Sequence, residues 1–184
     1  MKSKHLKRIL FILCLIILYS SCDNRKERIN KQINDLYSKI ISIPYSEMDT
    51  LTMDTTCIPL ESRYQLLVYV DSTECTPCYV SHYLDWELIL KECKKHEPSI
   101  TLTIIIEGDN ITDEVREKFL VSDFSKSIFI DKTGAFRKKN PAFPDSNIMH
   151  VLLLDKDNKV TLVGNPLSNK RIEELLYNKL RESR

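Results

Sequence analysis

The fold is decided by the stretch LLVYVDSTECTPC, residues 66–78. Its first five residues are a continuous apolar run, which is typical of a strand buried on both faces of a sheet. Polar residues 71–74 predict a turn, and from Cys75 to about Lys95 the apolar spacing becomes helical. The two cysteines of a C-x-x-C motif therefore stand where a buried strand meets the N-terminus of a helix.

That position favours reactive thiols. Unpaired N–H groups and the helix dipole at a helix N-terminus stabilise a thiolate, which makes Cys75 the predicted nucleophile. Cys78 lies one turn further along, close enough to attack a disulfide between Cys75 and another molecule. Thr76 and Pro77 complete the motif, and a proline in the first turn of a helix costs no hydrogen bond.

Strands and helices alternate along the rest of the chain. A βαβ order implies parallel strands, and two late strands joined by the turn 155–158 imply an antiparallel hairpin. We therefore expect an α/β fold with a mixed central sheet flanked by helices. The further strands are predicted at residues 100–106, 128–130, 151–154 and 160–163, the further helices near 112–119 and 168–180, and a loop at 132–147.

The first 21 residues have the features of an export signal. They carry four basic residues and no acid, and the apolar run 9–19 is shorter than the roughly 20 residues that span a membrane. Small residues then precede Cys22, as in a bacterial lipobox. We expect Cys22 to be lipidated, which would anchor the protein to a bacterial cell membrane, facing the periplasm or cell envelope. The other cysteines would then meet an oxidising compartment.

Residues 22–63 are interpreted as a tether. Apolar residues at positions 29, 33, 36 and 40 predict an amphipathic helix that ends before Pro44, and 45–63 could form an edge strand. The organised domain is predicted to span 64–184.

Composition limits the classes of function. Of 184 residues, 42% are hydrophobic and 29% charged, which suits one globular domain. The net charge is +1, but the part after the export signal is net negative, so we expect no nucleic-acid partner. Only three glycines occur, too few for a glycine-rich phosphate loop.

Residues 64–181 resemble the thioredoxin-fold domain of membrane-tethered TlpA/ResA thiol–disulfide oxidoreductases. The resemblance rests on the C-x-P-C motif at 75–78 and the strand–turn–strand block at 152–160, together with the lipidated N-terminus. It implies thiol–disulfide exchange with exported proteins, a membrane electron donor or acceptor, and no cofactor.

Three positions depart from that family. Glu74 replaces a tryptophan before the first cysteine, and Asp71 stands where an aromatic residue is usual. Met149 occupies the position of the family's cis-proline, which lies opposite the motif. We take Ile148, Met149 and His150 as the opposing loop and expect the Met149 bond to be trans, because a cis bond before a residue other than proline is costly.

Other interpretations stay open. The cysteine pair could be an inert disulfide in a binding or scaffold module. Thiolates, Met149 and His150 together would suit a soft metal such as Cu(I). Cys93 and His96 have zinc-like spacing to the motif, but a continuous helix would hold Cys78 and Cys93 about 22 Å apart. Cys57 and Cys93 could pair or stay free.

Overall fold

The computed structural model describes residues 26–37, 39–51, 62–73, 82–108, 111–113, 116–117 and 128–182. The chain divides into two compact units, Met1–Asp35 and Leu36–Arg184. The described part of the first unit is helical, in a helix that runs over residues 26–36. In the part of the chain that the structure describes, no helix is both long and apolar enough to cross a membrane.

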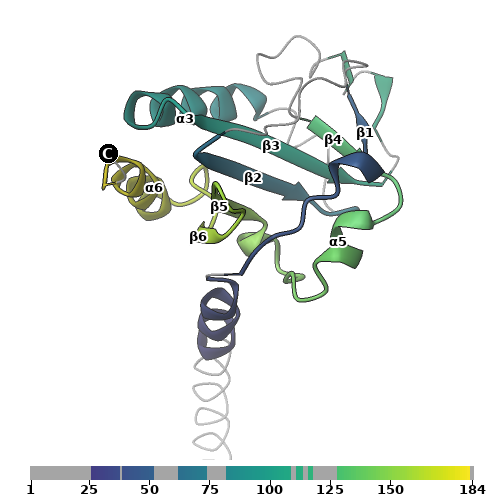
Figure 1. Ribbon diagram of the computed structural model, residues 1–184, viewed down its shortest axis with the longest axis horizontal. Helices are drawn as coiled ribbons and strands as arrows, with labels where there is room; N and C mark the ends of the chain where they lie inside the picture. The colour runs from purple at the N-terminus through teal and green to yellow at the C-terminus, as the bar shows by residue number, and fades with distance from the viewer. Residues whose placement is uncertain are drawn as a thin grey trace, which may run out of the picture. The chain divides into compact units, whose positions relative to one another are not determined.

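The second unit is built on one mixed six-stranded sheet, in the order β1-β4-β3-β2-β5-β6 (Figure 1). Three parallel strands form its centre, as the alternating pattern predicted, and the predicted late hairpin adds β5 and β6 in antiparallel fashion. The parallel strands are β2 (Tyr64–Val70), β3 (Ile100–Glu107) and β4 (Ile128–Asp131); the antiparallel strands are β1 (Asp49–Thr50), β5 (Val151–Asp155) and β6 (Val160–Val163).

Helices cover both faces of the sheet because alternate side chains of each strand point to opposite faces. On one face, Leu66 and Val68 of β2 share a core with Trp86 of α3 (Tyr83–His96) and Leu176 of α6 (Lys170–Glu182). On the other face, Tyr69 stacks on Phe136 of α5 (Ala135–Lys139), with ring centroids 4.9 Å apart. The short helices η1 (Tyr45–Glu47) and η3 (Asn147–Met149) complete the unit.

The expected loop at 132–147 is wrong in part, because it contains α5 and the start of η3. The fully buried carboxylate of Asp131 accepts hydrogen bonds from the backbone N–H groups of Ala135 and Phe136, each at 2.8 Å. Gly134 enters the helix in the left-handed conformation, with φ 68°. One carboxylate thus satisfies two of the N–H groups that a helix start leaves unpaired.

The turn at 155–158 is as predicted. Asn158 has a positive φ of 58°, a conformation that asparagine tolerates better than most residues. Asp155 Oδ1 accepts hydrogen bonds from the backbone of Asp157 (2.9 Å) and Lys159 (3.0 Å), which fixes the turn.

Candidate functional site

The predicted cysteine motif lies outside the described residues. This holds for Cys75, Thr76, Pro77 and Cys78, and equally for Cys22. The structure describes the two elements that flank the motif in sequence, β2 with its continuation to Thr73, and α3 with the preceding His82.

The predicted opposing loop lies beside the carboxyl end of β2. The backbone N–H of Tyr69 donates to the carbonyl of His150 at 2.9 Å, and Val151 then pairs with Val68. No peptide bond among the described residues is cis, so Met149 has a trans bond as expected. The three predicted residues are therefore brought next to the strand that leads into the motif.

Their side chains differ in exposure. Ile148 is 51% exposed, whereas Met149 and His150 are buried, at 0% and 1%. His150 Nε2 lies 3.0 Å from the carbonyl oxygen of Pro144, and its ring stacks on Phe143. The burial of both Met149 and His150 does not favour the soft-metal interpretation.

Arg137 of α5 connects three segments at this end of the sheet. Its Nη2 donates to Asp71 Oδ2 at 2.8 Å, and its Nε donates to the Tyr69 hydroxyl at 3.2 Å. Its Nη1 donates to the carbonyl of Pro144 (3.2 Å) and to Asp145 Oδ1 (3.0 Å). The guanidinium also lies 5.1 Å from the centroid of the Tyr69 ring. This cation therefore ties the end of β2 to α5 and to the loop before η3.

The charges of this cluster stabilise one another. Burial alone would raise the pKa of Asp71, but hydrogen bonds from Thr73 and the positive charge of Arg137 outweigh it and lower that pKa. Burial raises the pKa of the Tyr69 phenol, which stays a neutral donor and acceptor. Asp71 Oδ1 accepts from both the backbone N–H and the hydroxyl of Thr73, each at 2.8 Å. Asp71 thereby fixes the first residues that lead toward Cys75.

Sequence reasoning missed this cluster. Arg137 belongs to the segment 132–147 that was expected to be a loop, yet its side chain is only 21% exposed. The signal that could have located it is Asp71 itself, because a carboxylate directly after a buried strand needs a partner.

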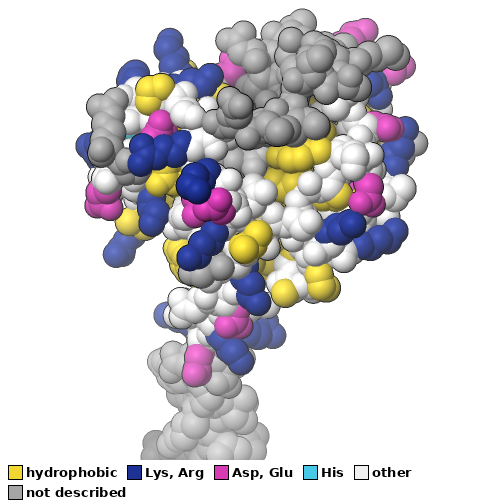
Figure 2. Space-filling view, in the orientation of Figure 1, with side chains coloured by type: hydrophobic (Ala, Val, Ile, Leu, Met, Phe, Trp, Pro, Cys, Tyr) yellow, Lys and Arg dark blue, Asp and Glu magenta, His cyan; other side chains and the backbone are white. Residues whose placement is uncertain are grey.

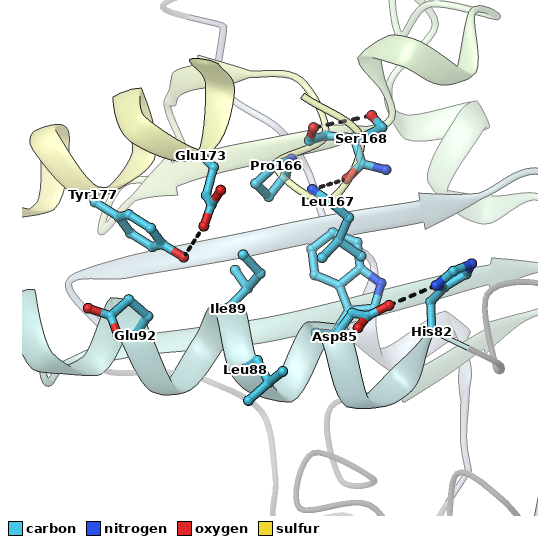
Figure 3. Close-up of a pocket in the computed structure, with 12 residues that line it drawn as sticks. His82, Asp85, Leu88, Ile89, Glu92, Pro166, Leu167, Ser168, Glu173 and Tyr177 are labelled. Atoms are coloured by element: carbon cyan, nitrogen blue, oxygen red, sulfur yellow. Dashed lines mark hydrogen bonds and ion pairs between the residues drawn. The ribbon is translucent and has the colours of Figure 1, made fainter. Parts of the chain in front are cut away.

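A groove of about 890 Å³ lies between α3, α6 and the loop 165–168 (Figure 3). Trp86, 1% exposed, and Ile89, 7% exposed, form its floor, and Pro166 and Leu167 lie across from them. At one end the exposed His82 contacts Asp85, with Nδ1 and Oδ2 2.8 Å apart.

Cys93 is a free, fully buried cysteine on α3. Burial, with a smaller effect from the charge of Glu92, raises the pKa of its thiol to about 12. The helix α3 from Tyr83 to His96 keeps Cys93 in the core, whereas Cys78, the other end of the distance that the zinc argument uses, lies outside the described residues. Among the described residues, no group of three metal-binding side chains is present.

The comparisons with known proteins bear on the fold. No family model and no curated protein matches this chain. The bacterioferritin comigratory protein of Xanthomonas campestris is similar in structure, with a TM-score of 0.50 and 13% identity over 78% of this chain and 94% of that one. The fold is thioredoxin-like.

Two further solved structures are similar with lower scores. The thioredoxin domain of a thiol–disulfide oxidoreductase from Bacteroides vulgatus has 15% identity and a TM-score of 0.45, covering 66% of this chain and 81% of that one. A thioredoxin-like protein from Bacteroides caccae has 20% identity and a TM-score of 0.42. This chain is matched over 63% of its length but spans only 40% of the Bacteroides caccae protein. At these identities, the likeness concerns the fold alone.

Proposed function

We propose that the protein carries out thiol–disulfide exchange through Cys75 and Cys78. The observation that carries the proposal is the thioredoxin-like fold, in which the C-x-x-C motif is, by sequence, the connection from the carboxyl end of β2 to α3. Ligand sites of open α/β sheets lie at the carboxyl ends of the parallel strands. The loop 148–150 lies beside that end of β2, which supports its role as the surface opposite the motif.

The exchange proceeds in two balanced steps. The Cys75 thiolate attacks one sulfur of a substrate disulfide, so a mixed disulfide forms and the first substrate thiolate leaves. The Cys78 thiolate then attacks Cys75 Sγ, which releases the second substrate thiolate and leaves Cys75 and Cys78 joined. The substrate gains two electrons and the motif loses two. The reverse sequence oxidises a substrate dithiol, and neither direction needs a cofactor.

The proposed location and partners of the protein follow from its predicted N-terminal export signal. Lipidation of Cys22 would hold the domain at a bacterial membrane, where its substrates would be exported proteins. A membrane thiol–disulfide partner would restore the starting state of the motif. The Bacteroides vulgatus structure is described as belonging to a thiol–disulfide oxidoreductase, which agrees with this chemistry.

The first experiment equilibrates the full-length protein in glutathione buffers of graded potential, alkylates free thiols, and quantifies the peptide with Cys75 and Cys78 by mass spectrometry. We expect a two-electron transition between about −100 and −280 mV, the range of working exchange proteins. Absence of a transition in that range would overturn the proposal and favour a binding module with an inert cysteine pair.

A trapping experiment tests the assigned roles. Cys78→Ser should accumulate mixed disulfides on Cys75 in cells, because the resolving thiol is missing. Cys93→Ala is the matched control, since Cys93 is buried and its high pKa keeps it protonated. Covalent partners in the control alone, or in neither variant, would contradict the roles given to Cys75 and Cys78.

A further inference from the structure

The groove between α3 and α6 begins, in sequence, just after the predicted motif. Its first lining residue, His82, follows Cys78 by four positions, and the lining continues along α3 to Glu92. Ten residues of helix rise about 15 Å, which is room for roughly four or five residues of extended chain. Because α3 follows the motif directly in the sequence, the groove is a candidate site for the part of a substrate next to its reacting disulfide.

The groove offers apolar contact. Trp86 and Ile89 of α3 line it, and in Figure 3 Ile89 projects from α3 toward the side where Pro166 and Leu167 lie. Leu88 lines the same groove and is 65% exposed. Covering such a leucine removes apolar area from water, which is favourable for a partner with apolar side chains.

The charged residues of the lining have one sign. They are the carboxylates of Asp85, Glu92 and Glu173, beside the imidazole of His82; among the described residues of the lining there is no lysine or arginine. On the face of the second unit that Figure 2 shows, by contrast, acidic and basic side chains are interspersed. A lining with carboxylates only complements a basic partner.

The present partners of these carboxylates are easily displaced. Glu92 pairs with Lys95 at 2.5 Å and lies 3.6 Å from His96 Nε2. Glu173 pairs with Lys170 at 2.8 Å and accepts a hydrogen bond from the Tyr177 hydroxyl at 3.1 Å, which can stay in place when the lysine is displaced. Both lysines lie outside the lining, and their side chains are 62% and 76% exposed. Exposed ion pairs of this kind contribute little stability, so a cation on a bound chain can replace them at small cost.

We propose that this groove binds an extended segment of the exchange substrate that alternates apolar and basic side chains. The proposal rests on the proposed function, since it names the class of polypeptide that the thiol pair acts on. Apolar side chains would cover Leu88 and the half-buried Leu167, and basic ones would meet Glu92 and Glu173 across the groove.

Binding is tested with the full-length protein and three labelled synthetic peptides of equal length, in which leucine alternates with lysine, serine or glutamate. Fluorescence anisotropy gives the affinities. We expect the Leu–Lys peptide to bind best, and its affinity to fall as salt is added. Equal affinities for the three peptides, or no binding of the Leu–Lys peptide, would overturn the proposal.

Pairs of variants, one inside the groove and one outside it, test whether the Leu–Lys peptide binds in the groove. Leu88→Gln should weaken Leu–Lys binding roughly tenfold through lost apolar burial. Leu175→Gln should leave it unchanged, because Leu175 is 44% exposed but does not line the groove. Glu173→Gln should weaken binding and reduce its salt dependence, whereas Glu174→Gln, an exposed neighbour outside the lining, should not. Equal effects within either pair would contradict the assignment.

A rate measurement separates this inference from the proposed function. Exchange is followed with glutathione disulfide and with a Leu–Lys peptide that carries one disulfide. We expect Leu88→Gln to slow only the peptide reaction. Reaction of both disulfides at rates that Leu88→Gln leaves unchanged would overturn the groove assignment. Reaction of neither would overturn the proposed function, while the anisotropy data still decide whether the groove binds peptide.

Discussion

Arg137 holds three segments together at the carboxyl end of β2. Each nitrogen of its guanidinium donates a hydrogen bond, to Asp71, to Tyr69 and to the segment 143–145. Such a planar, permanently charged group directs five donors from three nitrogens, whereas the three donors of a lysine come from one atom and cannot reach acceptors this far apart. Asp71 stands where the TlpA/ResA family usually has an aromatic residue, and here its charge is paired with Arg137 of α5, far along the chain.

Arg137→Met should lower the free energy of unfolding by about 2 kcal/mol, because Asp71 and the Tyr69 hydroxyl lose a donor in a half-buried site. Arg137→Lys should recover part of this loss. Lys139→Met is the matched control on the same helix, since Lys139 makes only an exposed pair with Glu47 at 3.3 Å. Urea denaturation measures all three, and equal losses for Arg137→Met and Lys139→Met would refute the role of Arg137.

Asp71 should also contribute to the pH dependence of stability. Its pKa is lower in the folded protein than in the unfolded chain, so its stabilisation is present above the unfolded value of about 3.9. That stabilisation is lost as the pH falls through the folded pKa. Unfolding free energies measured from about pH 6 down to pH 2 should fall less steeply in Asp71→Asn than in the wild type. Parallel curves for the two proteins would contradict this.

At the scale of elements, the sequence predicted the buried central strands, because these strands are long apolar runs. The strand at 66–70 is a continuous apolar run, and the strand at 100–106 is apolar except for Thr101 and Thr103. Both strands are central in the sheet and almost wholly buried. The helix α5 was missed because it has only five residues and no full apolar repeat. Its stability comes from the Asp131 carboxylate and from the burial of Phe136, neither of which a periodicity reveals.

Asp131→Ala should therefore destabilise α5 selectively, by about 1–2 kcal/mol, as the loss of a helix cap does. Asp131→Asn should cost less, since one amide oxygen can still accept a hydrogen bond. Hydrogen exchange of the Ala135 and Phe136 amides should accelerate in both variants, more than exchange in α6. Unchanged protection of these two amides would show that the carboxylate does not hold the helix.

At the scale of the whole unit, the segment 39–51 contacts both edges of the described sheet. Ile40 bridges Lys159 beside β6, and β1 pairs with β4 at the opposite edge. Between these points, Ser42 exchanges two hydrogen bonds with Asn140, at 2.9 and 2.8 Å. Unprotected sheet edges favour association with other chains, and this segment covers both. The sequence predicted an edge strand within 45–63, and β1 lies at one edge. It did not predict the contact beside β6, because contacts between such distant segments leave no local pattern.

A comparison of two fragments tests that role. A chain of residues 36–184 should unfold cooperatively and stay monomeric, because it keeps the segment 39–51. A chain of residues 64–184 should lose stability and associate in a concentration-dependent way, because it lacks β1 and the bridge at Ile40. Urea denaturation and sedimentation measure both properties. Equal stability and equal mass for the two fragments would show that residues 36–63 serve only as a tether, and that the sheet needs no cover at its edges.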